Sequence, residues 1–141
     1  MLDKLDIQET ISLYHEGGST SDWDQVMATF LPDGIWEVPA LHIQSQGHAA
    51  IRGTMAALMA PIEYLVQINA PAIITVDGDS ASARSLIREC AKFRGQAGVI
   101  DVVGQFNDEL QRTPAGWKFA HRTFTVFGTH LSAETPAEGS P

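Results

Sequence analysis

Residues 99–128 have the sequence VIDVVGQFNDELQRTPAGWKFAHRTFTVFG, which predicts two long strands joined by a turn. From Val99 to Arg112 apolar and polar residues alternate, as they do in a strand with one buried face. Thr113-Pro114-Ala115-Gly116 is made of turn-forming residues, and the chain returns from Trp117 to Gly128. The upstream segments Tyr64–Asn69, Ala72–Val76 and Ala81–Phe93 also favour strands.

The N-terminal half predicts helices instead. Ile7, Ile11 and Tyr14 recur at helical spacing, and Gly17-Gly18 is expected to end this first helix. Asp22 resembles the N-cap of a second helix, and residues 48–60 carry the apolar spacing of a third. A short strand is expected at 35–38, after a turn at 32–34, and a loop at 40–47.

Helices followed by a run of antiparallel strands indicate an α+β fold. A curved, mainly antiparallel sheet with three N-terminal helices on one face would enclose a cavity for a small apolar ligand. The 141 residues suit one domain, expected at 1–131. Residues 132–141 are rich in Pro, Ser, Gly, Ala and Glu and are expected to form a flexible tail.

The composition of the chain indicates which binding partners are unfavourable and in which cellular compartment the protein is expected. A formal net charge of −8 argues against binding to nucleic acid or to an anionic membrane surface. No segment is long and apolar enough to span a bilayer, and the charged N-terminus does not resemble a signal peptide. The single cysteine, Cys90, fits a reducing compartment, so a cytoplasmic protein is expected.

The sequence indicates neither a metal nor a nucleotide cofactor. The histidines His15, His42, His48 and His130 have no ligand-type spacing to one another or to carboxylates. No glycine-rich phosphate loop follows a predicted strand. We therefore expect a protein that works without a cofactor.

Three stretches, in order, resemble the SnoaL-like domains of the nuclear-transport-factor-2-like superfamily. They are Leu13-Tyr14 with SDWD at 21–24 and FLPDGIW at 30–36, VDGDSA at 76–81, and GQFNDE at 104–109 with GWKFAHR at 116–122. The resemblance implies a cone-shaped fold around one pocket, and a homodimer paired through the outer sheet face. The superfamily includes polyketide cyclases, dehydratases, a dehydrochlorinase, ketosteroid isomerases and non-catalytic modules, so the fold does not fix the reaction.

The resemblance also implies where a catalytic Asp–His pair would lie. The Asp would lie five residues after Tyr14, which is Ser19, and the His four residues before Asn69, which is Leu65. Neither residue type is present. Gln67 can form hydrogen bonds but cannot act as a base near neutral pH. Asp22 could replace the missing Asp, or it could serve only as a helix cap.

The isomerase branch suggests a second arrangement. There, a tyrosine matching Tyr14 and a protonated acid matching Asp108 share an oxyanion hole, and the base would fall at Val38, with Glu37 one residue away. Strand alternation places Asp108 on the same face as Phe106. Asp108 could instead be the ion-pair partner of Arg122 or Arg84, and Tyr14 an ordinary core residue.

His121 and Arg122 are neighbours on one strand, so only one of them can face the pocket. An outward Arg122 would place Phe124 and Val126 outward as well, where they would supply an apolar dimer interface. An inward Arg122 would conflict with that interface.

The predicted site therefore consists of catalytic candidates and pocket residues. The catalytic candidates are Tyr14, Asp108 and His121, and the pocket residues are Trp36, Val38, Leu65, Gln67, Phe106 and Arg122. We expect a pocket for a small hydrophobic cyclic molecule, such as a polyketide or steroid. The chain would then be either a cofactor-free lyase or isomerase, or a non-catalytic binding or accessory module.

Overall fold

The computed structural model describes residues 2–132. Its elements are α1 (Leu2–Thr20), α2 (Trp23–Met27), β1 (Phe30–Val38), the 3-10 helix η1 (Pro39–Leu41), β2 (Ile43–Gln46), α3 (His48–Met59), β3 (Ile62–Asn69), β4 (Ile73–Asp77), β5 (Ser80–Phe93), β6 (Val99–Thr113) and β7 (Gly116–Ser132). The seven strands form one sheet in the order β2-β1-β7-β6-β5-β3, and β4 pairs with β5. Only β1 and β7 run parallel; the other pairs are antiparallel.

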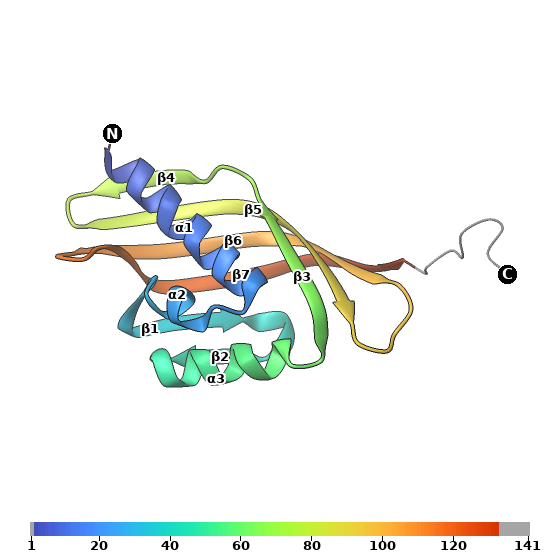
Figure 1. Ribbon diagram of the computed structural model, residues 1–141. Helices are drawn as coiled ribbons and strands as arrows, with labels where there is room; N and C mark the ends of the chain where they lie inside the picture. The colour runs from blue at the N-terminus through green and yellow to red at the C-terminus, as the bar shows by residue number, and fades with distance from the viewer. Residues whose placement is uncertain (1, 133–141) are drawn as a thin grey trace, which may run out of the picture.

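The helices cover one face of this curved, unclosed sheet (Figure 1). α1 packs across β3, β4 and β7, while α3 packs on β1 and β2. Ile7 and Ile11 of α1 are fully buried against a core that includes Phe106 of β6 and Phe119 of β7. The predicted α+β class, with helices on a mainly antiparallel curved sheet, is confirmed.

Three local predictions were wrong. α1 continues through Gly17-Gly18, because Gly17 is a contact point and not a stop: a Cβ there would lie 2.8 Å from Val26 Cγ2. The expected turn at 32–34 lies inside β1, where the register with β7 shifts. The expected loop at 40–47 contains η1 and the short strand β2.

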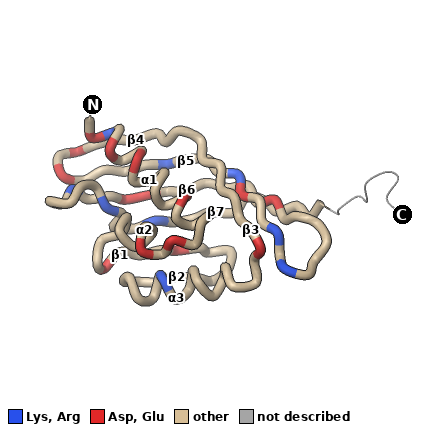
Figure 2. The backbone as a smooth tube through the Cα atoms, in the orientation of Figure 1, with Lys and Arg blue, Asp and Glu red and all other residues tan. Residues whose placement is uncertain are grey.

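Three further features concern the predicted tail at 132–141, membrane-spanning helices and the distribution of charged residues. Ser132 is the last residue of β7, and the rest of the predicted tail, 133–141, lies outside the described residues. Within residues 2–132, no helix has the length and apolar character needed to cross a membrane. Figure 2 shows basic residues on several elements, interspersed with acidic ones.

Gly104 marks a point where β6 and β7 lie unusually close. The register of the two strands shifts between Val103 and Gly104. A Cβ at Gly104 would collide with the carbonyl oxygen of Thr125 and would lie 2.7 Å from Cε2 of Phe124. The two strands can therefore pack this closely only because residue 104 is a glycine and has no side chain.

We expect Gly104→Ala to lower the free energy of unfolding by about 1–3 kcal/mol, because backbone atoms cannot move aside cheaply. Gly128→Ala on β7 is the matched control, since a Cβ there meets no atom within 4 Å. Urea denaturation measures both variants. Equal midpoints for the two variants would contradict this account of the strand contact.

Candidate functional site

A cavity of about 450 Å³ lies between the sheet and the helices. Its wall is mostly apolar, and its aromatic residues are Tyr14, Trp23, Trp36, Phe93, Phe106 and Phe124. Gln67 and Glu89 are the polar residues of the wall that take part in the hydrogen bonds described below. A concave apolar site with a few polar groups suits a small molecule.

The structure distributes the predicted site residues over three environments. Tyr14, Trp36, Val38, Leu65, Gln67 and Phe106 line the cavity. Asp108 and Arg122 are buried but are not part of the cavity wall. His121 lies away from the wall, where its Nε2 is 2.9 Å from Glu37 Oε2 and both side chains are partly exposed.

Phe124 and Val126 do not point outward, as they would if Arg122 pointed outward. Both residues line the cavity, and Arg122, two residues before Phe124, also points inward. Alternate residues of a strand share a face, so the inward Arg122 carries the other two with it. The predicted apolar patch on the outer face therefore cannot consist of these residues.

Arg122 has no solvent exposure, and its guanidinium is enclosed by aromatic rings. Its Cζ lies 4.1, 3.9 and 4.5 Å from the ring centroids of Tyr14, Phe106 and Phe119, within the range of cation–π attraction. Its Nε donates a hydrogen bond of 2.9 Å to Asp108 Oδ1. Of the alternatives for Asp108, the structure therefore has the ion pair with Arg122.

Burial raises the pKa of Asp108, and the charge of Arg122 opposes this shift. An arginine side chain stays protonated in proteins, so a neutral Asp108 would leave a buried cation without a counter-ion. We therefore treat Asp108 as a carboxylate. Its charge is committed to Arg122, not to a ligand.

His15 extends this interaction toward the cavity. Arg122 Nη2 lies 3.2 Å from His15 Nε2, and because a guanidinium can only donate, Nε2 must accept. The ring proton is then on Nδ1, which donates to Gln67 Oε1 at 2.7 Å. Burial, followed by the charge of Arg122, lowers the pKa of His15 to about 3, so the ring is neutral.

Glu89 completes the network at the cavity wall. Gln67 Nε2 donates to Glu89 Oε1 at 2.8 Å, across the β3–β5 pair in which these residues face each other. Burial raises the pKa of Glu89, and the Gln67 hydrogen bond opposes this shift. We call the connected side chains the polar chain; its members are Asp108, Arg122, His15, Gln67 and Glu89.

From its sequence context His15 was a candidate only for metal binding, and Glu89 was not predicted to have a role. One signal was available for Glu89, since alternation along 81–93 places it on the same face as Ile87 and Ala91. The contact between His15 and Arg122 joins residues 107 positions apart. Nothing local in the sequence indicates it.

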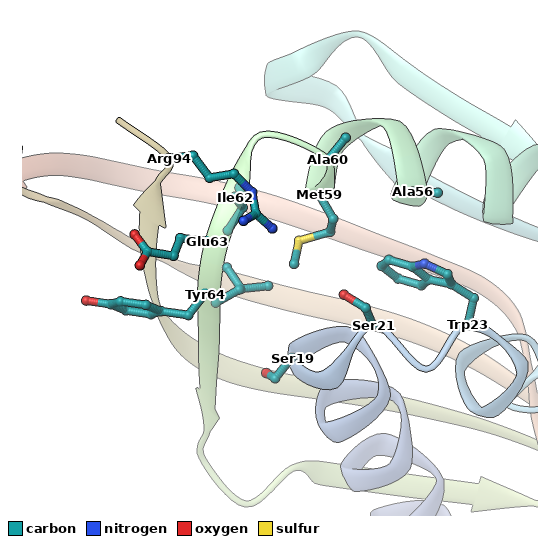
Figure 3. Close-up of a pocket in the computed structure, with 11 residues that line it drawn as sticks. Ser19, Ser21, Trp23, Ala56, Met59, Ala60, Ile62, Glu63, Tyr64 and Arg94 are labelled. Atoms are coloured by element: carbon teal, nitrogen blue, oxygen red, sulfur yellow. The ribbon is translucent and has the colours of Figure 1, made fainter. Parts of the chain in front are cut away.

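A groove of about 300 Å³ adjoins the cavity (Figure 3). The two share Trp23, Met59, Ile62 and Leu65 in their walls. Ser19, which stands with Leu65 at the positions implied for the Asp–His pair, also lines the groove. The two positions where the resemblance implies catalytic residues therefore lie in the wall of this groove.

The sequence model of the SnoaL-like domain matches residues 1–123, and the chain belongs to this family. Its fold is the NTF2-like fold. A candidate aromatic ring hydroxylase of Novosphingobium aromaticivorans is 26% identical, with a TM-score of 0.84 over 94% of this chain and 93% of that one.

Two further solved structures share the fold at lower identity. A candidate scytalone dehydratase of N. aromaticivorans is 18% identical, with a TM-score of 0.82 and 100% of both chains covered. A hexachlorocyclohexane dehydrochlorinase of type 2 is 14% identical, with a TM-score of 0.84 over 96% of this chain and 98% of that one. Both likenesses show the fold that this chain shares with these proteins.

We expect Arg122→Met to lower the free energy of unfolding by about 3–5 kcal/mol, because Asp108 would remain buried without a counter-ion. Arg122→Met combined with Asp108→Leu should be more stable than the single variant. Arg52→Met is the control, since it breaks an exposed ion pair with Asp24 and should cost less than about 1 kcal/mol. Urea denaturation measures the free energy of unfolding of each variant. A double variant no more stable than Arg122→Met would refute the ion pair between Arg122 and Asp108.

Proposed function

We propose that the protein binds a small, neutral, hydrophobic cyclic molecule, of polyketide or steroid type, in the cavity. The observation that carries this proposal is an apolar cavity of about 450 Å³. Two members of the polar chain, Gln67 and Glu89, form part of its wall. Flat aromatic side chains such as Phe106 and Phe124, which stack at a centroid distance of 4.7 Å, suit a ring-shaped ligand.

The charge of the wall supports a neutral ligand. Within residues 2–132, no lysine or arginine lines the cavity. An anion placed there would lose its hydration without gaining a counter-charge. The groove that shares its wall with the cavity is the proposed route of entry.

We further propose that the ligand is a substrate of a cofactor-free lyase or isomerase. Such reactions need a group that moves a proton. Tyr14 lines the cavity, but burial raises its pKa to about 12, which makes it a hydrogen-bond donor and not a base. Asp108 is the counter-ion of Arg122 and His121 is paired with Glu37, so neither suits the role predicted from the sequence.

A non-catalytic binding module is the second candidate. It is favoured by Ser19 and Leu65, which stand in the groove at the positions implied for the Asp–His pair. The two candidates predict the same binding but differ in whether a bound ligand is returned chemically unchanged. Incubation with candidate cyclic ketones, followed by mass spectrometry and deuterium exchange from solvent, separates them.

We expect Val126→Trp to weaken binding of the neutral probe N-phenyl-1-naphthylamine by more than tenfold, because an indole would fill part of the cavity. Thr125→Trp, on the opposite face of the same strand, should leave binding unchanged. Probe fluorescence measures both. Equal binding by the two variants would mean that the probe, and by extension the ligand, does not occupy this cavity.

We also propose a homodimer paired through the outer face of the sheet. Apolar residues exposed on that face include Val66, Ile68, Leu86 and Val103. They come from β3, β5 and β6, which neighbour one another, so they share the face away from the helices, with Arg88 lying between Ile68 and Val103. An exposed apolar patch of this kind is typical of a protein interface.

Leu86→Arg, on β5, the middle one of these three strands, should convert the dimer to a monomer, because a charge would be buried in the interface without a partner. Leu5→Arg is the control: Leu5 is comparably exposed, at 63% against 56% for Leu86, but lies on α1. Sedimentation velocity gives the oligomeric state. A dimer that persists in Leu86→Arg would rule out this face.

A further inference from the structure

Glu89 is the only acidic residue that lines the cavity among residues 2–132. One of its carboxyl oxygens, Oε1, accepts a hydrogen bond of 2.8 Å from Gln67. The other, Oε2, has no hydrogen-bond partner in the described part of the chain and is not among its fully buried atoms, while Glu89 lines the cavity. A ligand in the cavity would therefore meet Oε2.

The polar chain orients this carboxyl. Arg122 donates to His15, His15 donates to Gln67, and Gln67 donates to Glu89. Each step fixes the next, because the guanidinium has no acceptor and the imidazole has one proton. The amide of Gln67 thus presents N–H to Glu89, and Oε1 is held as an acceptor.

Among residues 2–132, no free positive charge lines the cavity around Glu89. On β5, Arg88 and Cys90 point to the opposite face, and on β6 the residue across from Glu89 is Val102. α1 contributes Tyr14 and the neutral His15, and β3 contributes Gln67. Arg122, the buried cation, is paired with Asp108 and is separated from Glu89 by two side chains.

A carboxylate in this position would be buried without compensation, which agrees with the raised pKa of Glu89. The neutral acid satisfies the geometry better. Its carbonyl oxygen accepts from Gln67, and its hydroxyl is available to the cavity. A wall that offers a hydroxyl donor selects a ligand with an acceptor oxygen.

We propose that Glu89 is a ligand-binding residue whose protonated carboxyl donates a hydrogen bond from Oε2 to the carbonyl oxygen of a neutral cyclic ketone. This inference rests on the proposed function and narrows its ligand class. A carboxylic acid would be a poor ligand, because its anion would face Glu89 with no cation on the wall.

The test uses tetralin and 1-tetralone, which differ by one carbonyl group, as competitors of N-phenyl-1-naphthylamine. The quantity measured is the ratio of their dissociation constants in the full chain and its variants. We expect Glu89→Leu to shift this ratio by about tenfold against 1-tetralone, the loss of one hydrogen bond. Glu89→Gln should keep most of the preference, since its amide still donates.

A pH series provides a second readout that does not depend on how Glu89→Leu folds. In the native chain the preference for 1-tetralone should decline as pH rises and Glu89 loses its proton, whereas Glu89→Gln should show no such decline. The carboxyl carbon shift of Glu89, followed by NMR, should titrate above the usual range of glutamate.

The outcomes separate this inference from the proposed function. Binding of tetralin with an equal ratio in the native chain and Glu89→Leu would overturn the role of Glu89 and leave the hydrophobic cavity standing. Ordinary titration of Glu89 would also overturn it. Failure of both compounds to bind the native chain would contradict the proposed function and this inference with it.

Discussion

The buried guanidinium of Arg122 is the constraint on which the rest of the site depends. A cation without solvent contact must find a counter-charge and acceptors inside the protein. Asp108 on β6 supplies the charge and His15 on α1 supplies an acceptor, while Tyr14 adds an aromatic face. The side chain of Arg122 on β7 therefore contacts both β6 and α1, and it links the sheet to the first helix.

This arrangement also determines what the cavity can offer a ligand. Because Arg122 points inward but is screened from the cavity by Tyr14 and Phe106, its charge is not available to the cavity. It acts instead through His15 and Gln67, whose hydrogen bonds all run in one direction. The effect at the wall is to orient the carboxyl of Glu89, not to present a positive charge.

Alternation and helical spacing predicted the fold because they are local properties of the chain. The β6–β7 strand pair, the three helices and the inward face of Phe106 followed from them. What failed depended on contacts between distant residues. Gly17-Gly18 was predicted to end the first helix, whereas Val26 packs against Gly17 and the helix continues. The orientation of Phe124 stayed open in the sequence, because it depends on where Arg122 finds its counter-ion. Glu89 meets its hydrogen-bond partner Gln67 only when β3 pairs with β5.

The positions that the family resemblance implies for a catalytic pair do not belong to the polar chain. The positions implied for an Asp–His pair, Ser19 and Leu65, line the groove, and neither carries an ionisable group. The polar residues of this chain lie deeper, where burial suppresses the charge of His15 and favours the neutral form of Glu89. A cavity that disfavours every uncompensated charge can still bind a neutral ligand, when one hydrogen-bond donor of the wall faces an acceptor oxygen of that ligand. That combination argues for recognition of a neutral oxygenated ring in preference to an anion.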